Sequence, residues 1–279
     1  MPALQFDRIA LDADTEILRK QVRQFVQENE SHFERPNSDF VTGHDPEFSK
    51  KLGEKGWIGM TWPAGYGGGE RSNFDRLVVT EELLAAGAPV SAHWIADRQS
   101  GPLLLRFGTE EQRQKYLPGI CRGESYFSIG MSEPDTGSDL ASVRTSAILE
   151  GDNYRVNGTK IWTTDAHRND YIICLVRTQP AEENRHAGLS QIIIDLKRDG
   201  AKVRPIKNMA GGEDFNEVVF EDVVVPKDRI VGEAGNGWAQ VTSELAYERS
   251  GPERFLSAFR VFVELVRFCG PEPTQHQAT

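Results

Sequence analysis

The spacing of the hydrophobic residues changes twice along this 279-residue chain, and this change constrains the fold more than any other feature. Over roughly the first 120 residues, apolar residues recur at helical spacing, as they do at Leu18, Val22 and Phe25. From about Glu124, short segments rich in β-branched and aromatic residues are separated by turn signals such as Asn157-Gly158. This regular spacing favours an antiparallel barrel or sandwich. The clearest predicted strands lie within residues 126–131, 154–164, 170–178, 190–196 and 216–225.

Helical spacing returns after residues 235–237, where Trp238, Val241 and Leu245 form one apolar stripe. A break at Gly251-Pro252 separates this helix from a final one, whose apolar residues surround it almost completely. Such a helix needs a surface to pack against. The pattern therefore predicts a multidomain α+β protein. Its parts are a helical domain at residues 1–121, a β domain at 122–236 and the start of a second helical domain at 237–279.

Local signals predict several helix boundaries in the first domain. One helix should end at Gly87, because glycine readily adopts the left-handed conformation of a helix C-terminus. A second should be broken at Gly101-Pro102, where proline lacks the amide donor. Thr109 and Gln112 form a capping box that begins a further helix. That helix should stop near Pro118-Gly119.

Charge and cysteine content exclude several classes of protein. The formal net charge is −10, which disfavours nucleic acid or an anionic membrane as the main partner. Cys121, Cys174 and Cys269 are odd in number and form no CxxC pair, so neither a disulfide framework nor a metal site is expected. No segment is long and apolar enough to span a bilayer. The first residues resemble neither a secretory nor a mitochondrial leader, so we expect a cytoplasmic protein.

Two segments of the β domain carry groups suited to a flat, polar-edged ligand. Residues 129–139, Ile-Gly-Met-Ser-Glu-Pro-Asp-Thr-Gly-Ser-Asp, join a strand to a turn dense in hydroxyls, with Gly137 free to take unusual dihedral angles. Residues 160–164, Lys-Ile-Trp-Thr-Thr, place an indole beside two hydroxyls. An indole can cover a flat ring while a neighbouring hydroxyl bonds its edge. Taken alone, the composition of the first segment favours a simple polar turn, and that of the second favours a cross-strand aromatic pair in a core.

Together, these segments resemble the flavin-binding signatures of the acyl-CoA dehydrogenase family. That family has a strand ending in a hydrophobic residue, then Ser or Thr, Glu-Pro, two small residues and Gly-Ser-Asp. A second strand then carries Asn-Gly, Lys, Trp, and Thr two positions after the Trp. Both patterns occur here in that order. Residues 56–68, 220–226 and 235–238 resemble the family too, so the likeness runs from about residue 15 to residue 268.

The resemblance implies an all-helical N-terminal domain, an antiparallel β-barrel and a C-terminal four-helix bundle, of which this chain carries only an incomplete part. FAD would lie between barrel and bundle. Met131 and Ser132 match the positions that meet the pyrimidine edge of the flavin, Trp162 lies against the ring, and Thr164 approaches N5. Ser138 matches a position near the phosphates or the acyl-CoA. The full set carried over to FAD is Ile129, Met131, Ser132, Ser138, Trp162, Thr163 and Thr164.

The reaction that the resemblance implies needs a base for the α-proton of a thioester. That proton is weakly acidic, so the base should be desolvated and the carbonyl polarised by hydrogen bonds. In the family, the base is a Glu late in the C-terminal bundle or on its first helix, and the early position matches Glu248. Glu248 falls roughly 50° from the centre of the apolar stripe and Glu244 roughly 90°, which makes Glu244 the poorer candidate. Arg249 flanks the stripe and could contact acyl-CoA, although Glu248 and Arg249 also suit a solvated charged pair.

Three functions fit this sequence. The first is an FAD-dependent dehydrogenase that converts an acyl-CoA to its trans-2-enoyl-CoA and passes electrons to an acceptor of the electron-transfer-flavoprotein type. The second is a related oxidase, such as an acyl-CoA oxidase or nitroalkane oxidase, that reduces oxygen. The third is a non-catalytic subunit of a heteromeric enzyme. The family's usual assembly predicts a homo- or hetero-oligomer, a dimer or a tetramer.

Overall fold

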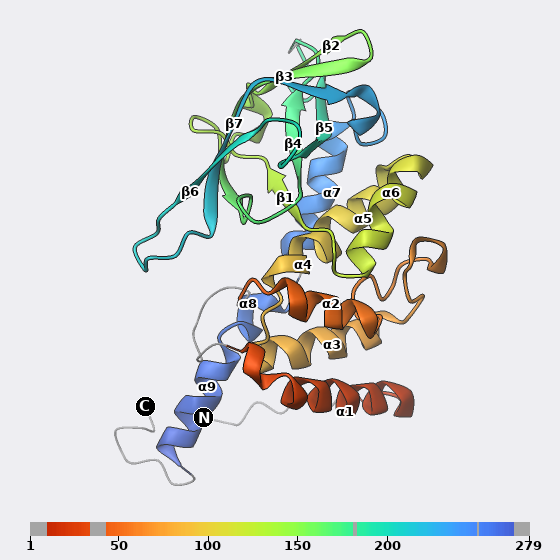
Figure 1. The fold of residues 1–279 in the computed structure, drawn as a ribbon, viewed down its shortest axis with the longest axis vertical. Coiled ribbons are helices and arrows are strands. Elements are labelled where there is room, and N and C mark those ends of the chain that lie inside the picture. The colour runs from red at the N-terminus through yellow and green to blue at the C-terminus, as the bar shows by residue number, and fades with distance from the viewer. Residues whose placement is uncertain (1–9, 34–42, 181–182, 250, 271–279) are drawn as a thin grey trace.

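The strands form a curled sheet above a layer of helices, and the C-terminal helices run down one side of both (Figure 1). The computed structural model describes residues 10–33, 43–180, 183–249 and 251–270. The first nine residues, on which part of the leader expectation rests, lie outside these ranges. The predicted order of helices, strands and helices is confirmed, and the last N-terminal helix ends at Cys121.

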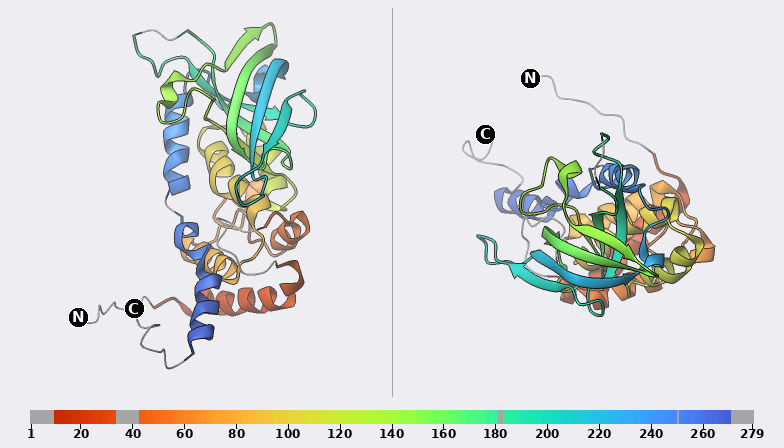
Figure 2. Two further views of the ribbon diagram at one scale, coloured as in Figure 1. Left: turned by 90° about the vertical axis from the view of Figure 1, so that its left-hand side faces the viewer. Right: turned by 90° about the horizontal axis from the view of Figure 1, so that it is seen from above.

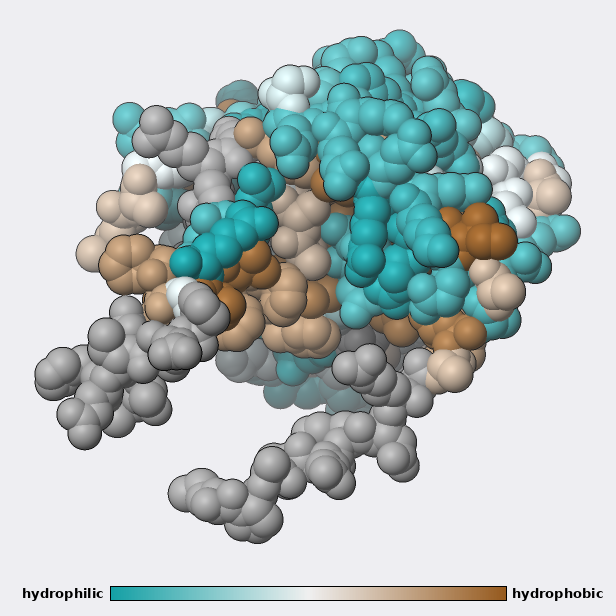
Figure 3. Space-filling view, turned by 90° about the horizontal axis from the view of Figure 1, so that it is seen from below, coloured by the Kyte–Doolittle hydropathy of each residue, from teal (hydrophilic) through white to brown (hydrophobic). Residues whose placement is uncertain are grey.

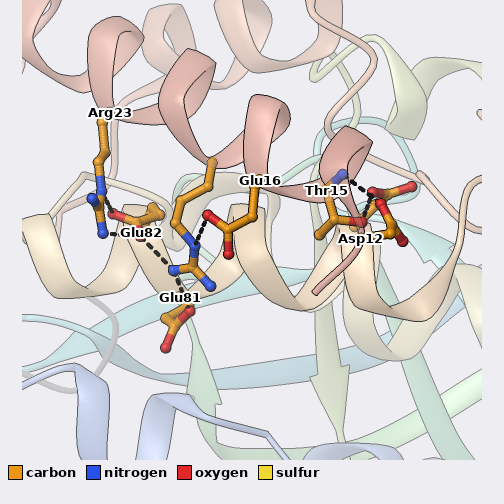
Figure 4. A network of polar contacts seen from close by, with 8 residues as sticks. Asp12, Thr15, Glu16, Arg23, Glu81 and Glu82 are labelled. Carbon is orange, nitrogen blue, oxygen red and sulfur yellow. Dashed lines mark hydrogen bonds and ion pairs between the residues drawn. The ribbon is translucent and has the colours of Figure 1, made fainter. Parts of the chain in front are cut away.

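The N-terminal helices pack on one another around a core that includes Leu18, Phe48 and Leu104. Two arginines of α1 tie it to α3: Arg19 Nη1 lies 2.6 Å and Arg23 Nε 2.8 Å from the carboxylate of Glu82 (Figure 4). The helices of this part are α1 (Ala13–Glu28), α2 (Pro46–Glu54), α3 (Asn73–Ala86), α4 (Ser91–Ile95), α5 (Gly101–Phe107) and α6 (Glu110–Cys121). Short 3-10 turns, η1 (Glu30–His32) and η2 (Ala64–Tyr66), lie between them.

Helix boundaries predicted from capping residues are correct, whereas those predicted from proline are only approximate. Gly87 ends α3 in the left-handed conformation, and the capping box of Thr109 and Gln112 begins α6. The break at Gly101-Pro102 is a π-helical turn, η3 (Ala96–Ser100), through which the chain passes from α4 into α5. The helix end predicted near Pro118-Gly119 falls slightly early, because Pro118 lies inside α6, which continues to Cys121. Burial of the last turn in the core outweighs the single backbone hydrogen bond that this proline removes.

The middle domain is a seven-stranded mixed sheet with the order β1-β4-β2-β3-β7-β6, and β5 pairs with β4. Most ladders are antiparallel, as expected for a barrel, but β1 and β2 run parallel to β4. β2 and β6 were not among the predicted segments, because they are short and largely exposed, so their side chains show no run of buried β-branched residues. The strands are β1 (Phe127–Gly130), β2 (Ser146–Glu150), β3 (Asn153–Thr164), β4 (Tyr171–Arg177), β5 (Leu189–Asp195), β6 (Lys202–Ile206) and β7 (Phe215–Pro226).

Helix α7 (Gly237–Arg249) connects the sheet to the N-terminal helices (Figure 2). Its Val241 packs with Leu175 and Leu189 of the sheet in a small hydrophobic cluster, against which Trp238 and Leu245 also lie. The chain breaks after α7, as Gly251-Pro252 predicted, and continues as α8 (Glu253–Leu256) and α9 (Phe259–Cys269). Because α7 contacts both the sheet and the N-terminal helices, it forms one side of the space between the two domains.

Helix α9 differs from α7 because much of its apolar surface is open to solvent. Phe262 is 55% exposed and Phe268 is 82% exposed. Seen from below, hydrophobic side chains gather at the surface on the side where α9 lies (Figure 3). The sequence prediction that this helix needs a further surface to pack against therefore agrees with its exposure in the described part of the chain.

Candidate functional site

A cavity of about 950 Å³ opens between the curled sheet, the α4–η3 segment and the C-terminal helices α7 and α8. This volume lies at the upper end of the range of small-molecule and cofactor sites. Eight of the nine side chains selected from the sequence line it. They are Ile129, Met131, Ser132, Ser138, Trp162, Thr164, Glu248 and Arg249. Thr163 does not line the cavity, because its side chain is buried within the sheet.

The first wall of the cavity begins where β1 ends. The turn that follows is closed by two backbone hydrogen bonds, from the Glu133 amide to the Thr136 carbonyl at 2.7 Å and from the Thr136 amide to the Glu133 carbonyl at 3.0 Å. Ser132 and Ser138 lie on either side of this turn and face the cavity. Gly137, singled out in the sequence for its backbone freedom, has no positive φ in this turn. A Cβ there would meet no atom within 4 Å, which leaves open space beside the turn.

A buried ion pair joins this turn to β3. Lys160 Nζ lies 2.8 Å from Glu133 Oε1 and donates a second hydrogen bond to the Met131 carbonyl at 3.0 Å. The Lys160 side chain is 0% exposed. Burial would raise the pKa of Glu133, but Lys160 and the amides of Thr145 and Arg144 hold that pKa below its ordinary value. The carboxylate is therefore ionised, and the pair fixes the turn at Met131 relative to the strand that carries Trp162.

The strand bulges after Lys160, and this bulge turns the Trp162 ring outward. The register of β3 against β7 shifts between Lys160 and Thr163, and Trp162 has φ 60°. For a bulky residue, this conformation is a true outlier that costs on the order of 1–3 kcal/mol. The ring is 57% exposed and meets Phe215 edge to face, with centroids 6.2 Å apart. Strain of this kind is concentrated at functional sites, and here it presents an indole to the cavity.

The opposite wall is the face of α7 that carries Glu248. This carboxylate is half-buried, and its Oε1 lies 3.3 Å from Arg254 Nη2. Arg249 is exposed at the rim of the cavity.

Glu244 lies one turn before Glu248 and faces away from the cavity. It is 1% exposed and accepts a hydrogen bond from Gln191 Nε2 of β5 at 2.8 Å. Burial raises the pKa of Glu244 to about 8. The sequence ranked Glu244 below Glu248 as a candidate base, and Glu244 lies outside the cavity. The sequence also placed Glu244 at the edge of the buried stripe, whereas its side chain is fully buried. The helical angle was measured from a single buried stripe, whereas α7 is covered on two sides, by the sheet and by α5 and η3.

Residues of the N-terminal domain complete the cavity, and no sequence motif marked them as functional. They are Gly43, His44, Ser91, Trp94, Ile95 and Gln99. Ser91 Oγ donates a hydrogen bond to Asp165 Oδ2 at 2.8 Å, which ties α4 to the end of β3. Burial lowers the pKa of His44, whose Nε2 has no hydrogen-bond partner among the described residues. Asp165 also lines the cavity, and only its position next to Thr164 in the sequence could have marked it as a candidate site residue.

Other classes of site are not seen in the described part of the chain. No group of three or more His, Cys, Asp or Glu side chains is arranged to hold a metal ion within residues 10–33, 43–180, 183–249 and 251–270. In these same ranges, no helix is both long enough and apolar enough to cross a bilayer.

Comparison with protein families gives two matches that together cover most of the chain. Residues 12–124 match the family model described as acyl-CoA dehydrogenase, N-terminal domain, and residues 128–223 match the model of the middle domain. Among curated proteins, acyl-CoA dehydrogenase FadE26 of Mycobacterium tuberculosis is 40% identical over 201 residues, which are 71% of this chain and 50% of FadE26. Acyl-CoA dehydrogenase FadE29 of the same organism is 36% identical and matches over 90% of this chain and 65% of its own. The chain thus spans between half and two thirds of the length of these relatives.

Solved structures agree in fold. The structure titled Tcur3481-Tcur3483 steroid ACAD superposes with a TM-score of 0.81 and 34% identity, over 93% of this chain and 68% of the other. The ChsE4-ChsE5 complex from Mycobacterium tuberculosis superposes with a TM-score of 0.79 and 33% identity, over 97% of this chain and 69% of the other.

Proposed function

Because this chain belongs to the acyl-CoA dehydrogenase family, we propose that it binds FAD and carries out the α,β-dehydrogenation of an acyl-CoA thioester to the trans-2-enoyl-CoA. One observation carries the proposal. Glu248 of α7 lines the same cavity as Met131 and Ser132 after β1 and Trp162 and Thr164 of β3. Segments that lie far apart in the sequence thus supply a carboxylate on one wall and hydroxyl and indole groups on the other.

The sheet wall fits the isoalloxazine ring of FAD. The exposed indole of Trp162 offers an apolar face to a flat ring, and the Ser132 and Thr164 side chains offer hydrogen bonds to its polar edge. The open space beside Gly137 allows a ligand to approach the backbone of the turn. In this role Met131, Ser132, Trp162 and Thr164 hold the ring, with Ile129 beside them, and Ser138 lies near the phosphates or the acyl-CoA. When bound, FAD supplies the acceptor for the hydride from the substrate β-carbon.

Glu248 is the base that takes the α-proton in this proposal. Its half-buried carboxylate faces the cavity, and a bound acyl group would remove the remaining water from around it. Loss of water raises the basicity of a carboxylate, which the weakly acidic α-proton requires. Arg254 and Arg249 place positive charge at the same end of α7, where the anionic CoA would be attracted.

The relatives suggest a bulky acyl group and a second subunit. One similar structure is titled a steroid ACAD, and two are named as pairs of different chains. A cavity of about 950 Å³ has room for more than a short acyl chain. We therefore extend the proposal to a bulky acyl-CoA, to an assembly with a second acyl-CoA dehydrogenase chain, and to an electron acceptor of the electron-transfer-flavoprotein type.

The absorbance spectrum tests the proposal. The purified chain is mixed with FAD, alone and with its assembly partner, and anaerobic acyl-CoA of several classes is added. We expect a yellow protein that one class bleaches. A protein that leaves FAD in solution under both conditions contradicts cofactor binding. Admission of oxygen afterwards separates the two enzyme classes, since rapid recovery of colour indicates the oxidase and slow recovery the dehydrogenase.

A further inference from the structure

Thr164, whose hydroxyl the proposed function places near N5 of the flavin, lies where β3 leaves the sheet. The ladder between β3 and β7 shifts register just before it, and the strand ends at Thr164 itself. Its half-buried side chain lines the cavity. A hydroxyl that has to meet one atom of a ligand needs a backbone that is held in place by the residues around it. Buried side chains of two neighbouring strands provide this support.

Ser128 of β1 holds the peptide group that follows Thr164. Its hydroxyl donates a hydrogen bond to the Thr164 carbonyl at 2.7 Å. At the other end of the same peptide group, the Asp165 amide donates to the Asp214 carbonyl at 2.8 Å. Because a peptide group is planar, hydrogen bonds at its two ends fix its orientation. Ser128 is 0% exposed, so water does not compete for its bond.

Asn216 of β7 holds the peptide group that precedes Thr164. Its Nδ2 donates a hydrogen bond to the Thr163 carbonyl at 2.9 Å, and Asn216 is also 0% exposed. Both peptide groups beside Thr164 are therefore held by buried side chains. A residue has only two soft backbone angles, φ and ψ, and these two contacts restrict both of them at Thr164. Only rotation about χ1, which is itself stiff in threonine, then remains to direct the hydroxyl.

Asn169 sets the direction in which Ser128 donates. Asn169 Nδ2 donates to Ser128 Oγ at 2.9 Å and to the Phe127 carbonyl at 3.0 Å. Asn169 reaches β1 because the chain turns back after β3, where the Asn169 amide donates to the Asp165 carbonyl at 3.0 Å. Since Ser128 Oγ accepts the hydrogen bond from Asn169, its own proton is directed to the Thr164 carbonyl.

From these contacts we propose that Ser128 and Asn216 are positioning residues for Thr164, and that Asn169 acts through Ser128. None of the three side chains lines the cavity, so they act on the reaction only through the residue that they hold. The inference rests on the proposed function, which gives the Thr164 hydroxyl its partner. A hydrogen bond donated to N5 stabilises the charge that arrives there with the hydride, and a donor that is already in place does so without reorganisation.

A double-mutant cycle tests this inference. Ser128→Ala removes the hydrogen bond to the Thr164 carbonyl, and Thr164→Val removes the hydroxyl that is positioned. Each variant is loaded with FAD labelled with ¹⁵N at N5, with its assembly partner where one is needed. The ¹⁵N chemical shift measures hydrogen bonding at N5, and anaerobic stopped-flow absorbance measures the rate of flavin bleaching by acyl-CoA.

Ser128→Ala should move the chemical shift part of the way towards its value in Thr164→Val. It should also slow bleaching by about tenfold, without a change in the acyl-CoA concentration that gives half the maximal rate. In the Thr164→Val background, Ser128→Ala should change the bleaching rate by less than about twofold, because the hydroxyl that it positions is already absent.

Ser49→Ala is the matched control. Ser49 of α2 is also 0% exposed, and its hydroxyl contacts the Asp45 carbonyl at 3.1 Å and His93 Nδ1 at 2.8 Å, but it does not line the cavity. Its loss should leave the chemical shift and the bleaching rate unchanged. Asn216→Ala should move the chemical shift in the same direction as Ser128→Ala. Thermal unfolding shows which variants fold, and Asn216→Ala decides if Ser128→Ala does not.

The outcomes separate this inference from the proposed function. If neither the chain nor its assembly binds FAD, the proposed function fails and the inference fails with it. If FAD binds but Thr164→Val leaves the chemical shift unchanged, this hydroxyl does not meet N5 and the inference is refuted. It is also refuted, while the proposed function stands, if Ser128→Ala leaves the chemical shift unchanged. Equal slowing by Ser128→Ala with and without the Thr164 hydroxyl shows a purely structural role and refutes it too.

Discussion

The two walls of the cavity are built in different ways. The sheet wall is fixed from within by the buried pair of Lys160 and Glu133, whose carboxylate also accepts two backbone amides. The α7 wall carries Glu248, which is half-buried and has one ion pair with Arg254. The wall proposed for the flavin is thus arranged before any ligand binds, whereas the wall proposed for the base has its charged group near solvent. This contrast suits a site that holds one ligand permanently and exchanges the other.

The largest effect is expected at the α7 wall. Glu248→Gln removes the proposed base and leaves the sheet wall intact, so FAD should still bind while flavin bleaching by acyl-CoA slows by about a thousandfold or more. Anaerobic stopped-flow absorbance measures the rate, and the bound-flavin spectrum measures retention. Glu264→Gln is the control. An unchanged bleaching rate would remove Glu248 from the mechanism, and no bleaching in either protein would favour the non-catalytic subunit.

The buried face of α7 should make stability depend on pH. Burial raises the pKa of Glu244 from 4.5 to about 8. The folded protein keeps the proton over a range in which the unfolded chain loses it, so the free energy of unfolding is highest below about pH 4.5 and falls as the pH rises towards 8. At about 1.4 kcal/mol per pKa unit, the loss is on the order of 5 kcal/mol.

Glu244→Gln tests this, because the amide keeps a partner for Gln191 but cannot ionise. Urea unfolding at pH 5 and pH 8 gives the two free energies. The variant should lose much of the difference between them. Glu264→Gln is the control for an exposed carboxylate and should keep the wild-type pH dependence. If the wild-type protein is equally stable at pH 5 and pH 8, Glu244 is not buried in its neutral form.

The sheet wall should be sensitive to the loss of one member of its ion pair. Lys160→Met leaves Glu133 buried without its counter-charge, and we expect a loss of about 3 kcal/mol in the free energy of unfolding together with weaker FAD binding. The control Lys202→Met breaks an exposed pair with Glu221 and should cost less than about 1 kcal/mol. Adding Glu133→Gln to Lys160→Met should recover part of the loss. Equal effects of the two lysine substitutions would remove the contrast between the walls.

The smallest effect is expected beyond the α7 wall, on α9. Phe262 is exposed, so Phe262→Gln should change the free energy of unfolding of this chain by no more than about 0.5 kcal/mol. Phe25→Ala, in the core, should cost about 3 kcal/mol or more and serves as the reference. A loss above about 2 kcal/mol for Phe262→Gln would mean that α9 is covered in solution.

The sequence by itself determined the features that depend on residues close together in the chain. The Gly87 terminus, the capping box of Thr109 and Gln112, and the order of helical and strand segments each rest on contacts within a few residues. Six cavity-lining residues of the middle domain and Glu248 were also selected, through motifs matched to a family.

The tertiary structure decided what depends on which surfaces meet. The extension of α6 past Pro118, the parallel pairing of β1 with β4 and the burial of Glu244 follow from packing between distant segments. A helical residue at a given angle is exposed, buried or aimed into a cavity according to what covers that side of the helix. Burial then sets the free energy of a charge, so the protonation of Glu244 could be determined only once its neighbours were known.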